Sequence, residues 1–180
     1  MKQNHVFFFF ALVLLTGFFA ACATSQTQYN TAYAQYIRHD NDAALEILAK
    51  ITKKDPSFLP SHLLQAEIFL GRGETDRAEK ALLAAEEILP GDHMIPFNLG
   101  NLYYQKNEYQ KAIEFYSKSI TLNPNFNKAY LNRANLYLTI KSYKNALADY
   151  DSFLSLTPEG YENVKRLAAL LRHDLEAISR

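Results

Sequence analysis

The sequence predicts an all-α protein built from four helical hairpins of equal length, followed by one further helix. Two observations carry this prediction. Pro56, Pro90, Pro124 and Pro158 follow one another at intervals of 34 residues, and a fixed interval of this length is typical of a structural repeat. The composition, 48% hydrophobic and 21% charged residues, is that of a folded domain once a targeting segment is set aside.

Residues 1–21 have the pattern of a secretory signal peptide. Lys2 lies in a short polar start, and Val6 to Ala21 are apolar except for Thr16 and Gly17. A polar start, an apolar middle and small residues at the end are typical of a cleaved signal. The apolar run is short for a spanning helix, which needs about 17–25 residues.

Cys22 is the single cysteine of the chain, and it follows Phe19, Ala20 and Ala21. This tetrapeptide resembles the bacterial lipobox, although Phe19 stands where leucine is usual. The resemblance implies that Cys22 is lipidated and becomes the mature N-terminus, with residues 22–24 as a short tether. Two alternatives remain open at this point: ordinary cleavage that leaves a soluble protein, and an uncleaved N-terminal anchor.

The remaining chain falls into blocks with small residues at matching positions. The eighth positions are Ala32, Ala66, Gly100 and Ala134, and the twentieth positions are Ala44, Ala78, Ala112 and Ala146. Small residues let two helices approach closely, and proline ends the second helix of each block. The predicted blocks are 25–58, 59–92, 93–126 and 127–160.

Each block is predicted to hold two helices joined by a turn. In chain order, the expected helices are 26–38, 43–53, 60–72, 75–89, 94–106, 109–122, 128–140 and 143–156. Residues 161–180 place apolar residues such as Val164, Leu167 and Leu171 at helical spacing. They predict a capping helix that covers the exposed face of the last block.

The blocks resemble tetratricopeptide repeats. The resemblance is clearest in the third block, at Leu99-Gly100, Tyr103, Ala112, Tyr116 and Pro124, and the fourth block is nearly as close. It implies a right-handed superhelical solenoid whose concave groove, lined by the first helix of each hairpin, binds a protein or peptide. It also implies a scaffold rather than an enzyme.

The family's groove positions supply the candidate partner-binding residues. They are Tyr29, Tyr33, Tyr36, Phe97, Asn98, Asn101, Tyr104, Lys128, Asn132, Asn135 and Arg166. An asparagine amide carries both a donor and an acceptor, so repeated asparagines suit the backbone of an extended peptide. The alternative is that these asparagines only make the surface soluble, and at least one tyrosine of the first block is expected in the core.

A carboxylate clamp, as in some family members, is only partly matched. Asn101, Asn132 and Arg166 fall on its positions, but Phe97 and Glu162 stand where it needs lysines. The second block has more acidic than basic residues, which suits either a solvated face or the attraction of a basic partner.

Several function classes are excluded by composition and motifs. The chain has 19 basic and 19 acidic residues, so it lacks the basic surface of a nucleic-acid-binding protein. The five histidines and one cysteine show no metal-ligand spacing, and no phosphate-binding or nucleophile motif is present. We expect no metal, no cofactor and no enzymatic activity.

The sequence therefore predicts a membrane-tethered interaction scaffold in a bacterial cell envelope, facing the periplasm from the outer membrane if the cell has one. The partner is an unidentified protein or extended peptide, within an envelope assembly by family analogy. Two alternatives are kept: an accessory lipoprotein that binds a small ligand for a transporter, and a structural homo-oligomer.

Overall fold

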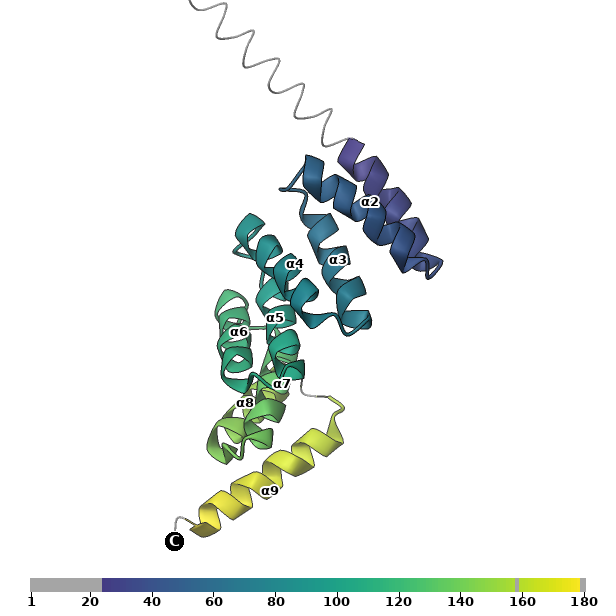
Figure 1. Ribbon diagram of the computed structural model, residues 1–180. Coiled ribbons are helices and arrows are strands. Elements are labelled where there is room, and N and C mark those ends of the chain that lie inside the picture. Colours follow the sequence, from purple (N-terminus) through teal and green to yellow (C-terminus); the bar gives the residue numbers. More distant parts are fainter. Residues whose placement is uncertain (1–23, 158, 179–180) are drawn as a thin grey trace, which may run out of the picture. The chain divides into compact units, whose positions relative to one another are not determined.

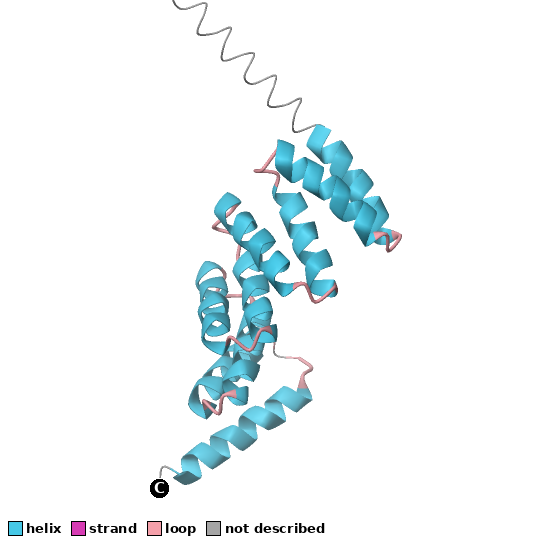
Figure 2. Cartoon of the chain, in the orientation of Figure 1, coloured by secondary structure: helices cyan, strands magenta, loops and turns pink. Residues whose placement is uncertain are grey.

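The computed structural model describes residues 24–157 and 159–178. All regular secondary structure in these residues is helical (Figures 1 and 2), which confirms the predicted all-α class. The chain divides into two compact units, Met1–Ile88 and Leu89–Arg180. The sequence predicts one continuous stack, and a superhelix running through all four blocks stays a prediction.

The first unit contains four described helices. They are residues 24–37, α2 (Asn41–Lys54), α3 (Leu59–Gly71) and α4 (Thr75–Ile88). The helix α2 begins where the Asp40 side chain accepts a hydrogen bond from the Ala43 amide at 3.1 Å, which satisfies an otherwise unpaired N–H of the first turn.

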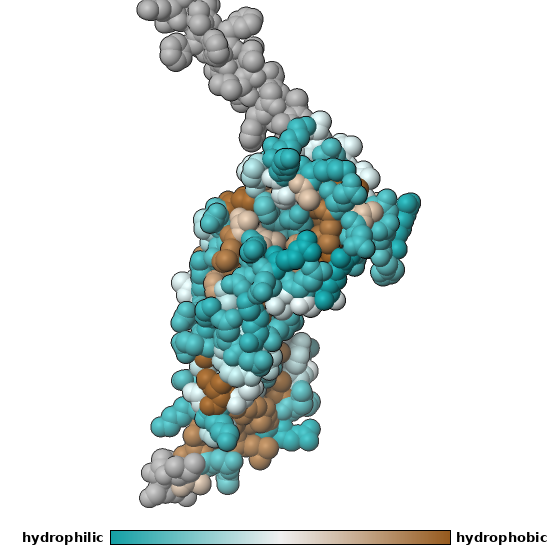
Figure 3. All heavy atoms as spheres, in the orientation of Figure 1, coloured by the Kyte–Doolittle hydropathy of each residue, from teal (hydrophilic) through white to brown (hydrophobic). Residues whose placement is uncertain are grey.

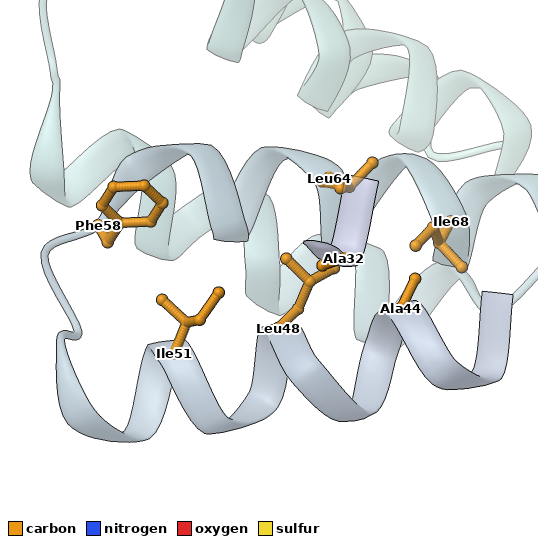
Figure 4. Close-up of a cluster of buried hydrophobic side chains, with 7 residues drawn as sticks. All are labelled: Ala32, Ala44, Leu48, Ile51, Phe58, Leu64 and Ile68. Carbon is orange, nitrogen blue, oxygen red and sulfur yellow. The ribbon is translucent and has the colours of Figure 1, made fainter. Parts of the chain in front are cut away.

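The core of the first unit is formed by apolar residues of the first three helices and the turn before α3. Figure 4 shows these side chains pointing toward one another between the helices; they are Ala32, Ala44, Leu48, Ile51, Phe58, Leu64 and Ile68. Burial of these side chains is the main force that holds the hairpins together.

The second unit contains five helices: α5 (Met94–Gln105), α6 (Tyr109–Leu122), α7 (Asn127–Thr139), α8 (Tyr143–Leu156) and α9 (Glu162–Ile178). Val164, Ala168 and Leu171 of α9 are buried in one cluster with Tyr150 and Phe153 of α8. The helix α9 therefore covers the last hairpin, as a capping helix should.

The small residues lie where helices approach closely, as the pattern predicts. Ala44, Ala78, Ala112 and Ala146 have no exposed surface. Gly100 is the tightest point, because a Cβ atom built there would lie 2.6 Å from the Tyr116 ring. A methyl group at this eighth position would therefore require the Tyr116 ring to shift.

The helices begin and end within two residues of the predicted positions. The predicted blocks end at the non-helical residues Phe58, Asp92, Phe126 and Gly160. The turn inside each hairpin also repeats: His39, Gly73, Asn107 and Lys141 have φ angles of 63°, 73°, 58° and 60°. This left-handed conformation is higher in energy for other residues than it is for glycine.

Candidate functional site

A polar recess opens between α5, α6 and α7 in the second unit. Its volume is about 430 Å³, and its lining residues are Asn101, Tyr104, Gln105, Tyr116, Asn132 and Asn135. Because three of these residues are asparagines on the first helices of two successive hairpins, we call it the amide recess. Four predicted site residues, Asn101, Tyr104, Asn132 and Asn135, meet here.

Tyrosine hydroxyls hold two of the asparagines in one orientation. The Tyr116 hydroxyl donates a hydrogen bond to Asn101 Oδ1 at 2.8 Å, and the Tyr150 hydroxyl donates to Asn135 Oδ1 at 2.7 Å. Asn132 Nδ2 also donates to Asn101 Oδ1, at 2.8 Å. The same tyrosine–asparagine bond therefore occurs in both hairpins of the second unit.

These bonds decide which amide atoms a ligand can use. The carbonyl oxygens of Asn101 and Asn135 are engaged, whereas their Nδ2 groups make no hydrogen bond with the described part of the chain. Asn132 is turned the other way and keeps its Oδ1. A single asparagine thus does not present both a donor and an acceptor, as the sequence alone suggested; the three residues present them jointly.

Burial keeps the two tyrosines in the protonated form that donates. Tyr116 is 2% exposed and Tyr150 is fully buried. Burial raises the pKa of Tyr116 to about 12, although the neighbouring Asn132 amide opposes the shift, and burial also raises the pKa of Tyr150. Because an anionic tyrosine loses hydration in such a site, both hydroxyls remain donors at neutral pH.

A second recess of about 240 Å³ adjoins the same asparagine. Its lining residues are Leu131, Asn135, Tyr150, Tyr161, Asn163, Val164 and Leu167. We call it the α9 recess, because four of its residues lie on or directly before α9. Asn135 lines both recesses, so the apolar residues of the α9 recess adjoin the polar lining of the amide recess. The helix α9 thus lines a recess as well as covering the core, and hydrophobic residues reach the surface near α8 and α9 (Figure 3).

An ion pair in the second unit positions α7 between its neighbours. Arg133 Nε and Nη2 donate to the two carboxylate oxygens of Asp149 at 2.7 Å, and Nη1 donates to Ser117 Oγ at 2.6 Å. Asp149 is 5% exposed. Burial alone lowers the pKa of the Arg133 guanidinium, but the hydrogen bonds and charge of Asp149 raise it overall, so the guanidinium stays charged.

Other predicted residues of the second unit lie outside both recesses. Phe97 is 9% exposed and packs against Phe126, with ring centres 5.0 Å apart. Its predicted place on the groove surface is wrong, because this ring fills the core beside Tyr116. Asn98 is half-buried on α5, and Lys128 and Arg166 are exposed on α7 and α9; none of the three lines the amide recess or the α9 recess.

The tyrosines of the first unit form a row along residues 24–37. The ring centres of Tyr29 and Tyr33 lie 6.2 Å apart, and those of Tyr33 and Tyr36 lie 6.0 Å apart. Tyr29 packs on Phe58 of the core, whereas Tyr33 is 46% exposed. The Tyr36 hydroxyl donates to Glu67 at 2.8 Å, and this hydrogen bond raises the pKa of Tyr36.

Two residues of the site, Tyr116 and Tyr150, are not among the candidate residues that the sequence indicates. Their spacing holds a signal, because each lies 15 residues after its asparagine and the two pairs lie 34 residues apart. Cys22 and the predicted signal peptide lie outside the described residues. In residues 24–157 and 159–178, no three metal-binding side chains gather, and no helix is both long and apolar enough to cross a bilayer.

Comparisons with known proteins agree with this architecture. Tetratricopeptide repeat (TPR) profiles match residues 97–126 and 128–159, and a profile for the second ARM domain of tetratricopeptide repeat protein 21 matches residues 12–73. The TPR repeat-containing protein YpiA of Bacillus subtilis is 31% identical over 94 residues, which are 51% of this chain and only 22% of YpiA.

Solved structures show the same fold at low sequence identity. The crystal structure of MamA protein superposes with a TM-score of 0.76 at 20% identity, covering 83% of this chain and 81% of MamA. The first TPR of Spaghetti (RPAP3), solved bound to the HSP90 peptide SRMEEVD, superposes with a TM-score of 0.59 at 19% identity over 66% of this chain and 93% of that one. The repeated hairpins, their small-residue contacts and these matches together show that the chain belongs to the tetratricopeptide repeat family.

Proposed function

We propose that this protein is a membrane-tethered scaffold that binds an extended segment of a partner protein in the amide recess. TPR proteins are interaction scaffolds, and the finer assignment to one surface rests on the arrangement of Asn101, Asn132 and Asn135. Their Nδ2, Oδ1 and Nδ2 atoms offer a donor, an acceptor and a second donor. An extended backbone edge carries C=O and N–H groups in alternation, so the two sets complement each other.

The α9 recess supports a peptide rather than a free polar molecule as the occupant. Asn135 joins the polar lining of the amide recess to Leu131, Val164 and Leu167. A peptide lying across Asn135 places backbone groups on the amides and one apolar side chain against this wall. The peptide complex of the RPAP3 domain is consistent with peptide binding by this fold.

The tether is proposed at Cys22. A lipid chain contributes about 0.8 kcal/mol per buried methylene, and stable attachment takes more than one chain, which a diacylated cysteine provides. The described helices begin at residue 24, so the first unit starts close to the modified residue. The site of action is then the bacterial cell envelope, at the outer membrane facing the periplasm in a diderm cell, with an envelope assembly as the partner.

The recess is tested by replacing Asn101 and Asn135 together with alanine. The double variant removes both outward donors and is expected to reduce the partner's cross-linking yield in cells about tenfold or more, because two carbonyl groups of the peptide each lose a hydrogen bond. Asn98→Ala is the matched control, since Asn98 lies on the same helix outside the recess. Unchanged yield in the double variant, with circular dichroism like that of the wild type, would remove the amide recess from consideration.

The tether is tested separately with Cys22→Ala. The variant is expected to leave the membrane fraction while an intact Asn101–Asn135 surface still binds partner peptide in solution. A Cys22→Ala protein that remains in the membrane fraction at the wild-type level would contradict lipid attachment through this residue and leave the binding proposal untouched.

A further inference from the structure

A cavity in the first unit is lined by a carboxylate, so it suits a positively charged ligand rather than a carboxylate. It has a volume of about 340 Å³ and lies between the end of the helix at residues 24–37 and the end of α3. Its lining residues are Tyr36, Ile37, His39, Asn41, Glu67, Ile68 and Gly71. All of them belong to the first unit, and we call this cavity the cation pocket.

The only acidic side chain of the lining is Glu67, which is exposed. The Tyr36 hydroxyl occupies one of its carboxylate oxygens, Oε1, at 2.8 Å. The Arg72 guanidinium, which follows Gly71 in the chain, pairs with Asp42 at 2.8 Å, and Glu67 forms no ion pair with any of the described residues. The lining thus holds one carboxylate and no lysine or arginine.

Three other features of the lining favour a positive charge. Ile37 and Gly71 are the last residues of two helices, and helix C-termini carry a partial negative charge. The Tyr36 ring offers a face to which a cation is attracted. Asn41 Oδ1 is buried and accepts no hydrogen bond from the described residues. Ile37 and Ile68 add an apolar wall that suits an aliphatic stem.

We propose that the cation pocket binds a lysine or arginine side chain presented by a partner protein. The stem lies along Ile37 and Ile68, and the charged end reaches Glu67 and the Tyr36 ring. A lysine or arginine side chain has both an aliphatic stem and a charged end, whereas a free metal ion makes no favourable contact with the apolar wall. This proposal concerns the first unit and is independent of peptide binding in the amide recess.

The position of Glu67 in its block makes the pocket a specificity site. Glu67, Asn101 and Asn135 occupy the ninth position of the second, third and fourth blocks. The same register thus presents a carboxylate in one unit and amides in the other. The pocket selects for a basic residue in the partner, a requirement that the amide recess does not impose.

The test uses small probes and the isotope-labelled full chain. N-acetyl-lysine N-methylamide and N-acetyl-norleucine N-methylamide share an aliphatic stem and differ in the terminal charge. Titrations are followed by the ¹H–¹⁵N shifts of the backbone amides of His39, Asn41 and Gly71. We expect the lysine probe to shift these resonances with an affinity about fivefold or more above that of the norleucine probe.

Two charge-matched variants decide the outcome. Glu67→Gln is expected to abolish the preference for lysine, whereas Glu87→Gln removes the same charge from an exposed position of α4 outside the pocket and is expected to preserve it. Equal affinity for both probes, an unchanged preference in Glu67→Gln, or no shift at the highest soluble lysine concentration would each overturn the proposal. Asn101→Ala with Asn135→Ala tests the amide recess alone, so the two proposals fail independently.

Discussion

The two units use the ninth position of their repeats in different ways. In the second unit, Asn101 and Asn135 each receive a hydrogen bond from a buried tyrosine of the same hairpin. In the first unit, Glu67 receives one from Tyr36, which belongs to the preceding hairpin. The difference follows from the twenty-fourth position, which is Tyr116 and Tyr150 in one unit and Leu48 and Leu82 in the other. One repeat fold therefore supports two surfaces of different chemistry.

The units also differ in what holds their helices together. The Arg72–Asp42 pair between α3 and α2 of the first unit has an exposed carboxylate, whereas the Arg133–Asp149 pair between α7 and α8 of the second unit has a buried one. A salt bridge that loses one partner leaves an uncompensated charge in a poorly hydrated site. The second unit is thus expected to be the more sensitive of the two to loss of a single charge.

The largest expected effect is that of Asp149→Ala. Loss of this carboxylate leaves the Arg133 guanidinium largely buried without its partner, and we expect the second unit to lose about 3 kcal/mol of stability. Amide hydrogen exchange in α7 and α8 measures the loss. Glu46→Ala breaks the exposed pair with Lys50 in the first unit and is expected to change nothing measurable. Unaltered protection of α7 and α8 in Asp149→Ala would mean that the ion pair does not stabilise the second unit.

Alkaline pH is expected to lower the stability of the second unit by an intermediate amount. Tyrosine ionises near pH 10 in an unfolded chain, but in the folded state the pKa of Tyr116 is about 12. The folded state therefore holds the Tyr116 proton more tightly than the unfolded state does. The stability that this proton contributes to the folded state is fully present below pH 10 and is lost as pH rises to about 12. The second unit should lose about 2 kcal/mol over this range.

The check is the pH dependence of denaturant unfolding in the wild type and in Tyr116→Phe. The variant has no hydroxyl to ionise at this position, so its stability should fall less steeply between pH 10 and 12. Equal slopes in the two proteins would show that Tyr116 ionises alike in the folded and unfolded states.

The smallest change in stability is expected from substitutions in the turns. The two units have different residues there, but with the same left-handed backbone conformation. Lys141 in the second unit and Gly73 in the first have φ angles of 60° and 73°. Lys141→Gly is expected to raise stability by about 1 kcal/mol, and Gly73→Lys to lower it by a similar amount. Nothing lies within 4 Å of a Cβ atom built at Gly73, so the change reports backbone strain alone. Thermal unfolding of both variants measures it, and shifts of the same sign would contradict this explanation.

Much of the fold was predictable because it depends on a periodic pattern. The small residues at the eighth and twentieth positions indicated where helices meet, and Ala32, Ala44 and Ala146 are fully buried there. The site was predicted less completely. Asn101, Asn132 and Asn135 were identified from family positions, but Phe97, assigned to the same surface, belongs to the core.

The acidic residue Asp149 illustrates why the remainder was not predictable. A carboxylate in the middle of a helix indicates a solvated face by default, yet this one is buried against Arg133, 16 residues earlier. Only the register between two antiparallel helices brings these side chains together. The same holds for the hydrogen bonds from Tyr116 to Asn101 and from Tyr150 to Asn135.

The sequence by itself determined the all-α class, the helices to within two residues, and the positions at which small residues let two helices approach, because these depend on local propensity and a fixed repeat. The tertiary structure decided which atom of each asparagine faces outward, which aromatic ring enters the core, and where Glu67 meets the ends of two helices. These features depend on distances and directions between side chains of different helices, which packing sets and a linear pattern does not encode.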